Sequence, residues 1–159
     1  MKQFFTWRDD WSLGVDLMDK QHRQLALLLN RMADHCLNPS DAMDPEVRLQ
    51  QLHELMNLLY EKSRQHFDDE EVLMLEAGYS EHANHAREHR MLLAELKNYI
   101  REIEEERDDI NMGVLMSLKH WFISHIIKSD KEFAAFLSSQ TESLRAQPAR
   151  SQRQAGLSG

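Results

Sequence analysis

Two pairs of polar residues, each four positions apart, constrain this chain more than any other feature of its sequence. His66 and Glu70 form the first pair, and His85 and His89 form the second. Residues at this separation share one face of an α-helix, so each pair can hold one ion from a single rigid element. Three further candidate ligands lie far from these pairs along the chain: His22, His125 and Asp130. Together the seven residues predict a two-metal site inside a helical bundle.

The length and the cysteine count indicate one domain in a reducing environment. The chain has 159 residues, which fits a single domain able to bury a core without disulfides, and its one cysteine cannot form an intramolecular disulfide. The first ten residues turn to charge before an apolar signal-peptide core develops, and no later apolar run approaches membrane-spanning length. We therefore expect a cytoplasmic protein that does not insert into membranes.

The charge pattern argues against nucleic acid as a partner. The formal net charge is −8, and the basic residues are scattered among acidic ones, so no basic surface for phosphate backbones is expected. The chain has nine histidines but only five glycines and three prolines. This balance favours long helices and strengthens the case for metal binding.

Apolar residues recur at spacings of three and four in four stretches, which predicts four core-facing helices. The first is expected to begin near Asp19, and the second to run from Pro45, at the first helical position, to a stop at Gly78. The third is expected to begin near Ser80 and the fourth near Asn111. Helices of similar length joined by short turns predict an all-α antiparallel up-down four-helix bundle.

The two ends of the chain differ from the bundle. Residues 1–18 contain tryptophans without helical periodicity and predict an N-terminal arm laid against the body. Phe133 and Phe136 predict a short C-terminal helix. Beyond them almost nothing is apolar. We expect one domain over residues 1–137, followed by a disordered polar tail over residues 138–159.

The number of ligands in one core argues for metal. A single buried histidine is usually a hydrogen-bonded core residue. Five histidines and two carboxylates without partners would each cost about 1–3 kcal/mol, and metal would satisfy them all. The ligand types suit iron, manganese, zinc or copper. Two octahedral ions offer about twelve positions, of which five imidazoles, two bridging carboxylates and one bridging oxygen leave about one vacant.

Two residues do not follow this pattern. Asp130 lies five residues after His125, so an ideal helix would turn it about 140° away, and the fourth helix is expected to end or unwind near Lys128. Alternatively, Asp130 caps the helix that holds Phe133, and both roles are compatible. His82 lies near the same helix face as the predicted ligands of its helix, and spacing alone does not exclude it.

The sequence resembles the hemerythrins, specifically the single-domain bacteriohemerythrins, from Trp7 to about Leu137. Four motifs carry the resemblance: Asp19-Lys-Gln-His22, His66-Phe-Asp-Asp-Glu70, His85-x-x-x-His89 and His125-x-x-x-x-Asp130. The resemblance implies two iron ions bridged by two carboxylates and an oxo or hydroxo group. One iron would be held by three residues: His85, His89 and His125. The other would be held by His22 and His66, and Glu70 and Asp130 would bridge the two.

The resemblance also implies reversible binding of dioxygen at the two-histidine iron, for carriage, storage or delivery. Apolar residues near the ligands are expected to wall this position: Leu25, Leu92, Trp121, Phe122 and Ile126. Oxygen or redox sensing, and iron handling or repair under oxidative or nitrosative stress, remain open alternatives at the same site. We do not expect an enzyme, because ferritin-like oxidases pair histidine with a glutamate three positions earlier and no histidine here has one.

Overall fold

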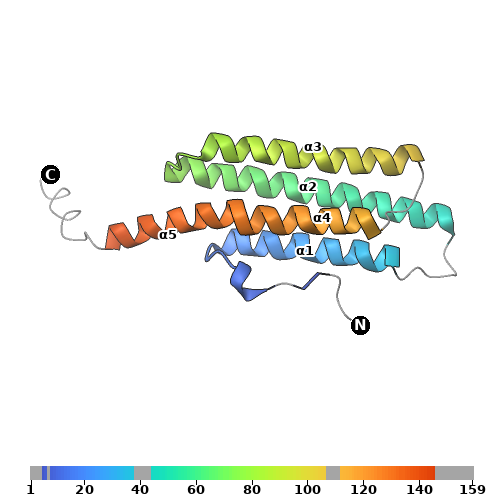
Figure 1. The fold of residues 1–159 in the computed structure, drawn as a ribbon, viewed down its shortest axis with the longest axis horizontal. Coiled ribbons are helices and arrows are strands. Elements are labelled where there is room, and N and C mark those ends of the chain that lie inside the picture. The colour runs from blue at the N-terminus through green and yellow to red at the C-terminus, as the bar shows by residue number, and fades with distance from the viewer. Residues whose placement is uncertain (1–4, 7, 38–43, 107–111, 146–159) are drawn as a thin grey trace, which may run out of the picture.

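The computed structural model describes residues 5–6, 8–37, 44–106 and 112–145, and Figure 1 shows long helices lying side by side. Successive helices run in opposite directions, with an arm before the first and a further helix after the fourth. The five α-helices are α1 (Asp16–Leu37), α2 (Pro45–Ala77), α3 (His82–Glu106), α4 (Met112–Ser124) and α5 (Lys131–Arg145). A 3-10 turn, η1 (Asp9–Trp11), lies in the arm, and a π-helical segment, η2 (His125–Asp130), joins α4 to α5. The predicted all-α bundle is confirmed.

The ends of α2 are set by the predicted residues. The side chain of Asp44 accepts a hydrogen bond from the Glu46 amide at 2.9 Å, and Pro45 occupies the first helical position. Gly78 stops the helix in the left-handed conformation, with φ of 68°. Only glycine adopts this conformation without strain from a side chain, so α2 ends here and the chain turns into α3.

The start of α1 differs from the prediction. The helix begins at Asp16, one turn before Asp19, which is buried inside its first turn. The carboxylate of Asp19 instead accepts hydrogen bonds from the Ser12 hydroxyl and the Leu13 amide, both at 2.7 Å. Asp19 therefore ties the arm to α1, a tertiary role that a capping pattern cannot distinguish from a helix start.

The arm packs on the bundle as predicted. The backbone amide of Phe5 donates to the Asn30 side chain, which donates in turn to the Phe5 carbonyl, both at 2.6 Å. The ring of Phe5 lies against Trp11 and Phe122 and is almost fully buried. These contacts place the arm over α1 and α4; Trp7 lies outside the described residues.

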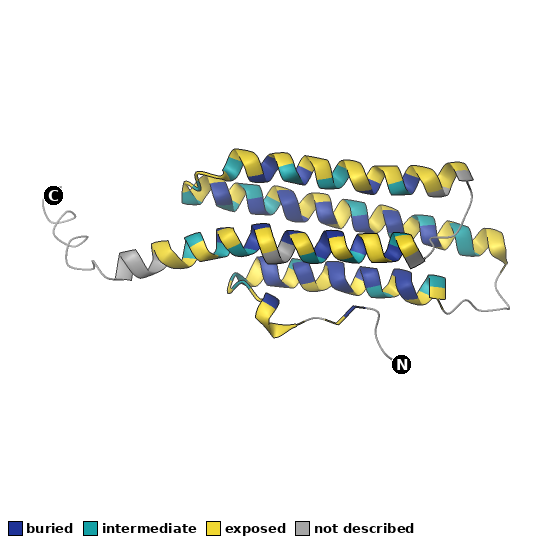
Figure 2. Cartoon of the chain, viewed as in Figure 1, coloured by how far each residue is buried: buried dark blue, intermediate teal, exposed yellow. Residues whose placement is uncertain are grey.

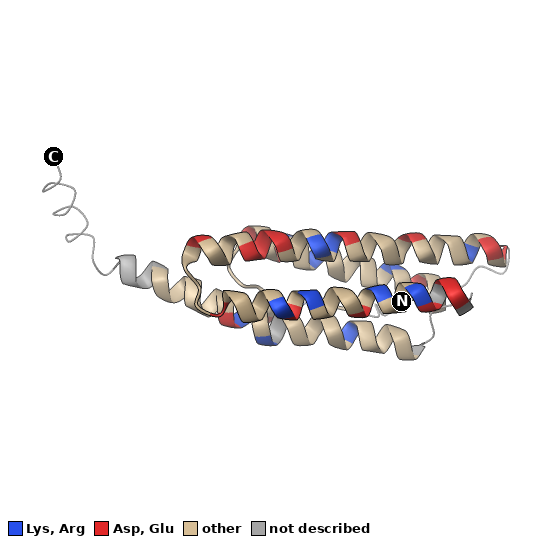
Figure 3. Ribbon diagram, turned by 90° about the horizontal axis from the view of Figure 1, so that it is seen from above, with Lys and Arg blue, Asp and Glu red and all other residues tan. Residues whose placement is uncertain are grey.

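The inward faces of the helices form one continuous core (Figure 2). Leu29 of α1, Leu59 of α2, Leu96 of α3 and Leu118 of α4 are all fully buried in it. The charged residues of both signs cover the outer faces (Figure 3). Within the described parts of the chain, no helix combines the length and the apolar character that crossing a bilayer requires. The metal ligands predicted from the sequence must therefore lie within an otherwise apolar interior.

The fourth helix was predicted to end or unwind near Lys128, and α-helical geometry does end in this region, since α4 stops at Ser124 and a π-helix spans His125–Asp130. The chain remains helical but widens into the π-helix η2, and α5 continues in the same direction (Figure 1). In a π-helix residue i bonds to residue i+5, so residues five apart come to share a face. The wider turn thus brings Asp130 to the same side as His125.

The C-terminal helix is longer than predicted. α5 continues to Arg145, so residues 138–145 are helical where a polar tail was expected. The rings of Phe133 and Phe136 pack on Tyr79 at 5.1 and 4.9 Å, and the Gln140 amide donates to the Ala77 carbonyl at 3.2 Å. The composition of residues 138–145 does not predict this extension, because they carry no apolar stripe. The contacts of Phe133 and Phe136 hold the first turns of the helix, and the polar residues continue it. Residues 146–159 lie outside the described part.

Candidate metal centre

The structure brings all seven predicted ligands together at one level of the bundle. They come from α1, α2, α3 and η2, and each is at most 5 % exposed: His22, His66, Glu70, His85, His89, His125 and Asp130. His82, which spacing alone could not exclude, is half-buried and does not join them. The three-four periodicity therefore placed the predicted ligands of α1, α2 and α3 on inward faces.

The seven side chains form two overlapping groups, in each of which the candidate ligand atoms lie within 4.8 Å of one another. The first group contains three histidines: His85, His89 and His125. The second group contains two histidines: His22 and His66. Glu70 and Asp130 belong to both groups. The site is thus asymmetric, with five side chains around one centre and four around the other.

Each carboxylate directs one oxygen toward each group. Asp130 Oδ1 lies 2.8 Å from His125 Nε2, whereas its Oδ2 lies 2.8 Å from His22 Nε2. Glu70 Oε1 lies 2.7 Å from His85 Nε2, and its Oε2 lies 3.7 Å from His66 Nε2. Each carboxylate therefore has one oxygen on the side of the three-histidine group and the other on the side of the two-histidine group.

The polar atoms at the centre of this cluster fit bound cations better than they fit one another. Among the described side chains, both oxygens of Glu70 and the Nε2 atoms of His89 and His125 are buried and make no hydrogen bond of good geometry, even where an oppositely charged atom is close. The Nε2 atoms of His22 and His66 face each other at 3.0 Å. Buried polar atoms without partners cost about 1–3 kcal/mol each, so a native core rarely keeps several in one place. Nitrogen and carboxylate donors converging in this way suit a transition metal.

The same closeness shifts the protonation equilibria of the cluster. Burial alone would lower the pKa of His85 and His125, but Asp130 and Glu70 outweigh it and raise these pKa values to about 9 and about 10. Burial would raise the pKa of Asp130, but His125 holds it well below the usual value. In the metal-free cluster, the negative charge of the carboxylates is therefore balanced by positively charged imidazolium groups. A bound cation would take over the role of this positive charge.

Phe67 is a site residue that the sequence analysis missed. Its ring stacks on His89 with centroids 4.0 Å apart and an interplanar angle of 9°. It also lies 5.6 Å from His66 and 5.2 Å from His125. Phe67 thus fills the space between ligands of both groups. Its position directly after a ligand was the available signal, but the helical stripe gave no reason to turn it inward.

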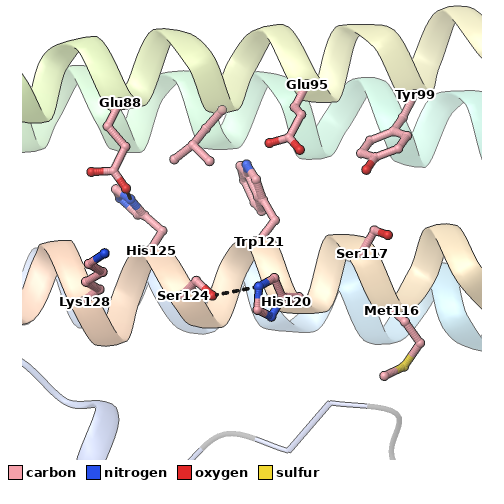
Figure 4. A pocket seen from close by; sticks show the side chains of 11 residues that line it. Glu88, Glu95, Tyr99, Met116, Ser117, His120, Trp121, Ser124, His125 and Lys128 are labelled. Carbon is pink, nitrogen blue, oxygen red and sulfur yellow. Dashed lines mark hydrogen bonds and ion pairs between the residues drawn. The ribbon is translucent and has the colours of Figure 1, made fainter.

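The predicted apolar wall divides between two places. Leu25 and Phe122 are buried, and the Phe122 ring lies 6.3 Å from the His22 ring, on the side of the two-histidine group. Leu92 and Trp121 instead line a groove of about 570 Å³ between α3 and α4, together with His125 (Figure 4). These two residues therefore lie on the side of His125, a member of the three-histidine group. The side chain of Ile126 lies outside the described ones.

Comparisons with known proteins agree with this geometry. The model of the family described as "Hemerythrin HHE cation binding domain" matches residues 13–137. A bacteriohemerythrin of Clostridium acetobutylicum is 26 % identical over 81 % of this chain and 98 % of its own length. One of Stenotrophomonas maltophilia is 30 % identical over 80 % of this chain and 78 % of its own length.

The fold also has a counterpart among solved structures. A crystal structure of wild-type hemerythrin aligns with a TM-score of 0.73 at 22 % identity, covering 85 % of this chain and 98 % of that one. The chain belongs to the hemerythrin family of cation-binding domains, and this membership implies that it binds iron.

Proposed function

We propose that the seven converging side chains hold two irons and that the protein binds dioxygen reversibly, as an oxygen carrier, store or donor. One observation carries the proposal: Glu70 and Asp130 each direct one oxygen to the three-histidine group and one to the two-histidine group. A carboxylate placed in this way can bridge two ions, and a dinuclear site can supply two electrons to one bound dioxygen.

The two centres would differ in vacancy. Three histidines and two carboxylates, with a bridging oxo or hydroxo group, complete six positions at the first centre. His22 and His66 with the same bridges leave one position open at the second. We therefore assign dioxygen to the two-histidine side, where Phe122 and Leu25 provide apolar surface.

The chain's own task is to keep water and protons away from that position. The ligand imidazoles are buried, and the neighbouring Phe122 and Phe67 rings offer no proton to a bound molecule. Polar donors act strongly in a low-dielectric interior, so their exclusion favours release of dioxygen over its reduction. We propose that the protein works in the cytoplasm, where its one cysteine, Cys36, would stay reduced.

The test is to oxygenate the reduced, iron-loaded protein and then to measure dioxygen recovered under vacuum beside peroxide formed in solution. We expect nearly all the bound dioxygen to be recovered over repeated cycles. Rapid peroxide formation with stranded oxidised iron would contradict a carrier. It would favour redox sensing or a stress role through the same ligands.

A further inference from the structure

Two of the candidate ligands are held from behind by polar side chains of a neighbouring helix. His66 Nδ1 lies 2.8 Å from the side-chain oxygen of Gln21, and His89 Nδ1 lies 3.0 Å from Glu71 Oε2. An amide oxygen and a carboxylate oxygen accept hydrogen bonds, so in both contacts the imidazole Nδ1 is the donor. This arrangement fixes the tautomer that leaves Nε2 free to bind a metal.

A third side chain, that of Glu88, lies near His125 as an ion-pair partner, at a separation longer than a hydrogen bond. Glu88 Oε1 lies 3.6 Å from His125 Nδ1, and Glu88 Oε2 accepts a hydrogen bond from the Ser129 hydroxyl at 2.7 Å. Figure 4 shows the Glu88 carboxylate reaching across from α3 to the His125 ring. Ser129 thereby holds the carboxylate beside this ligand.

These three side chains follow one rule around the bundle. Each is adjacent in sequence to a ligand of its own helix: Gln21 to His22, Glu71 to Glu70, and Glu88 to His89. Each nevertheless contacts the ligand of the next helix in the chain. Adjacent residues on an α-helix are rotated by about 100°, so a neighbour of an inward ligand points at the adjoining helix. The orientation of each ligand therefore depends on the rotation of the helix before it.

The three contacts are not equal in charge. Glu71 and Glu88 place carboxylates behind two histidines of the three-histidine group. Gln21 places a neutral amide behind His66 of the two-histidine group, and on this side the carboxylate of Asp69 is reached only through Gln21, whose Nε2 donates to it at 2.7 Å. An imidazole whose Nδ1 hydrogen bonds to a carboxylate binds a metal through Nε2 more strongly than one whose Nδ1 hydrogen bonds to an amide. The reason is that the charge-assisted hydrogen bond is stronger and makes the imidazole more basic.

We propose that Gln21, Glu71 and Glu88 are positioning residues, and that their unequal charge makes the three-histidine group the tighter of the two metal sites. The first metal ion would enter there and the second would occupy the two-histidine group. This inference rests on the proposed two-metal site but is independent of dioxygen. It predicts stepwise loading whose two steps respond to different residues.

The experiment is an anaerobic titration of the metal-free protein with Co²⁺, whose absorption spectrum reports each step. Glu71→Gln keeps the size and the acceptor atom but removes the charge, and it should weaken the first step by about 10–100-fold while leaving the second nearly unchanged. Glu88→Gln should act in the same direction. Gln21→Met should weaken only the second step, by a similar factor. Glu54→Gln, an exposed position on α2, removes one charge away from the site and should change neither step.

The outcomes separate the two proposals. If the parent takes up fewer than two equivalents of Co²⁺, the two-metal site itself is wrong and both proposals fall. If the parent takes up two equivalents but the glutamate variants weaken both steps alike, or neither, only the positioning role is overturned. Circular dichroism of each variant checks the fold, and the two glutamate variants provide independent measurements of the same step.

Discussion

Each of the two buried carboxylates performs a task that no histidine in the cluster can perform. An imidazole whose Nδ1 donates to a neighbouring side chain has a single nitrogen left for a metal. Asp130 and Glu70 have two oxygens each, and these oxygens face opposite groups. Loss of one carboxylate should therefore affect both centres, whereas loss of one histidine should affect mainly its own.

At the residue scale, Leu25→Ser tests whether apolar walls protect bound dioxygen. Leu25 is buried one turn after His22, so a hydroxyl there could donate a proton or admit water near the two-histidine group. We expect nearly normal iron loading, a stability cost of about 2–4 kcal/mol, and faster conversion of the oxygenated form to inert oxidised iron. Stopped-flow absorbance would measure this conversion.

The matched control is Leu29→Ser, which is equally buried one further turn from the ligands. It should cost similar stability without the faster conversion. If the two variants decay alike, general loosening explains the effect and the apolar wall does not.

At the scale of elements, the π-helix η2 explains how two residues five positions apart, His125 and Asp130, can face the same group of candidate ligands. Nothing in the local composition of residues 125–130 marks this segment, and only the distance between His125 and Asp130 demands it. A π-helical turn behaves as an α-helix with one extra residue. Removing one residue should therefore restore an α-helix in which the two ligands, now four apart, still share a face.

Deletion of one residue and insertion of one residue in this segment should therefore have opposite effects on metal content. Deleting Lys128, which is exposed, should leave two metals bound. Inserting one alanine between Ser129 and Asp130 should turn the carboxylate away and lose at least one metal. Metal analysis of both purified variants decides the matter. Retention of both metals after the insertion would show that Asp130 is not a ligand.

The end of α5 gives a second prediction at this scale. The rings of Phe133 and Phe136 in α5 pack on Tyr79, and Gln140 contacts the end of α2. Residues 146–159 have a mostly polar composition and are not expected to join a core. Truncation after Arg145 should leave metal content and dioxygen affinity unchanged. A clear loss of either in the truncated protein would mean that this segment contributes to the site.

Periodicity along single helices predicted the four helices and the inward positions of the histidines and Glu70, whereas the choice of Asp130 and the exclusion of His82 rested on the family resemblance. Gly78 and Pro45 marked helix ends through backbone constraints that act locally. The inward turn of Phe67 and the contact of Gln21 with His66 depend on how neighbouring helices are rotated, which no single stripe records. The π-helix is a change of pitch, and periodicity assumes a constant pitch.

At the scale of the whole molecule, the stability of the metal-free protein should depend on pH more strongly than that of the iron-loaded protein. The pKa values of His85 and His125 are raised to about 9 and about 10 from 6.5. A raised pKa in the folded state means that protonation stabilises the fold below about pH 6.5, and this contribution is lost as the pH rises through about 9 to 10. The thermal midpoint of the metal-free protein should therefore fall over this range.

Iron binding should oppose this loss of stability, because a metal binds neutral imidazole and its uptake releases protons. The iron-loaded protein should lose less stability than the metal-free protein between about pH 6.5 and 9. Scanning calorimetry of both forms measures this difference. His125→Gln, in metal-free form, should show a smaller fall with pH than the parent. A midpoint of the metal-free parent that rises over this range would contradict the assigned charge balance.

The two proposed irons would be joined by Glu70 and Asp130. The most direct measurement of this arrangement is iron content together with electron paramagnetic resonance of the oxidised protein, for the parent and for Glu70→Ala. We expect two irons per chain with no signal in the parent, since bridged ferric ions couple, and loss of this coupled pair in the variant. One iron per chain, two uncoupled irons, or an unchanged pair in Glu70→Ala would contradict it.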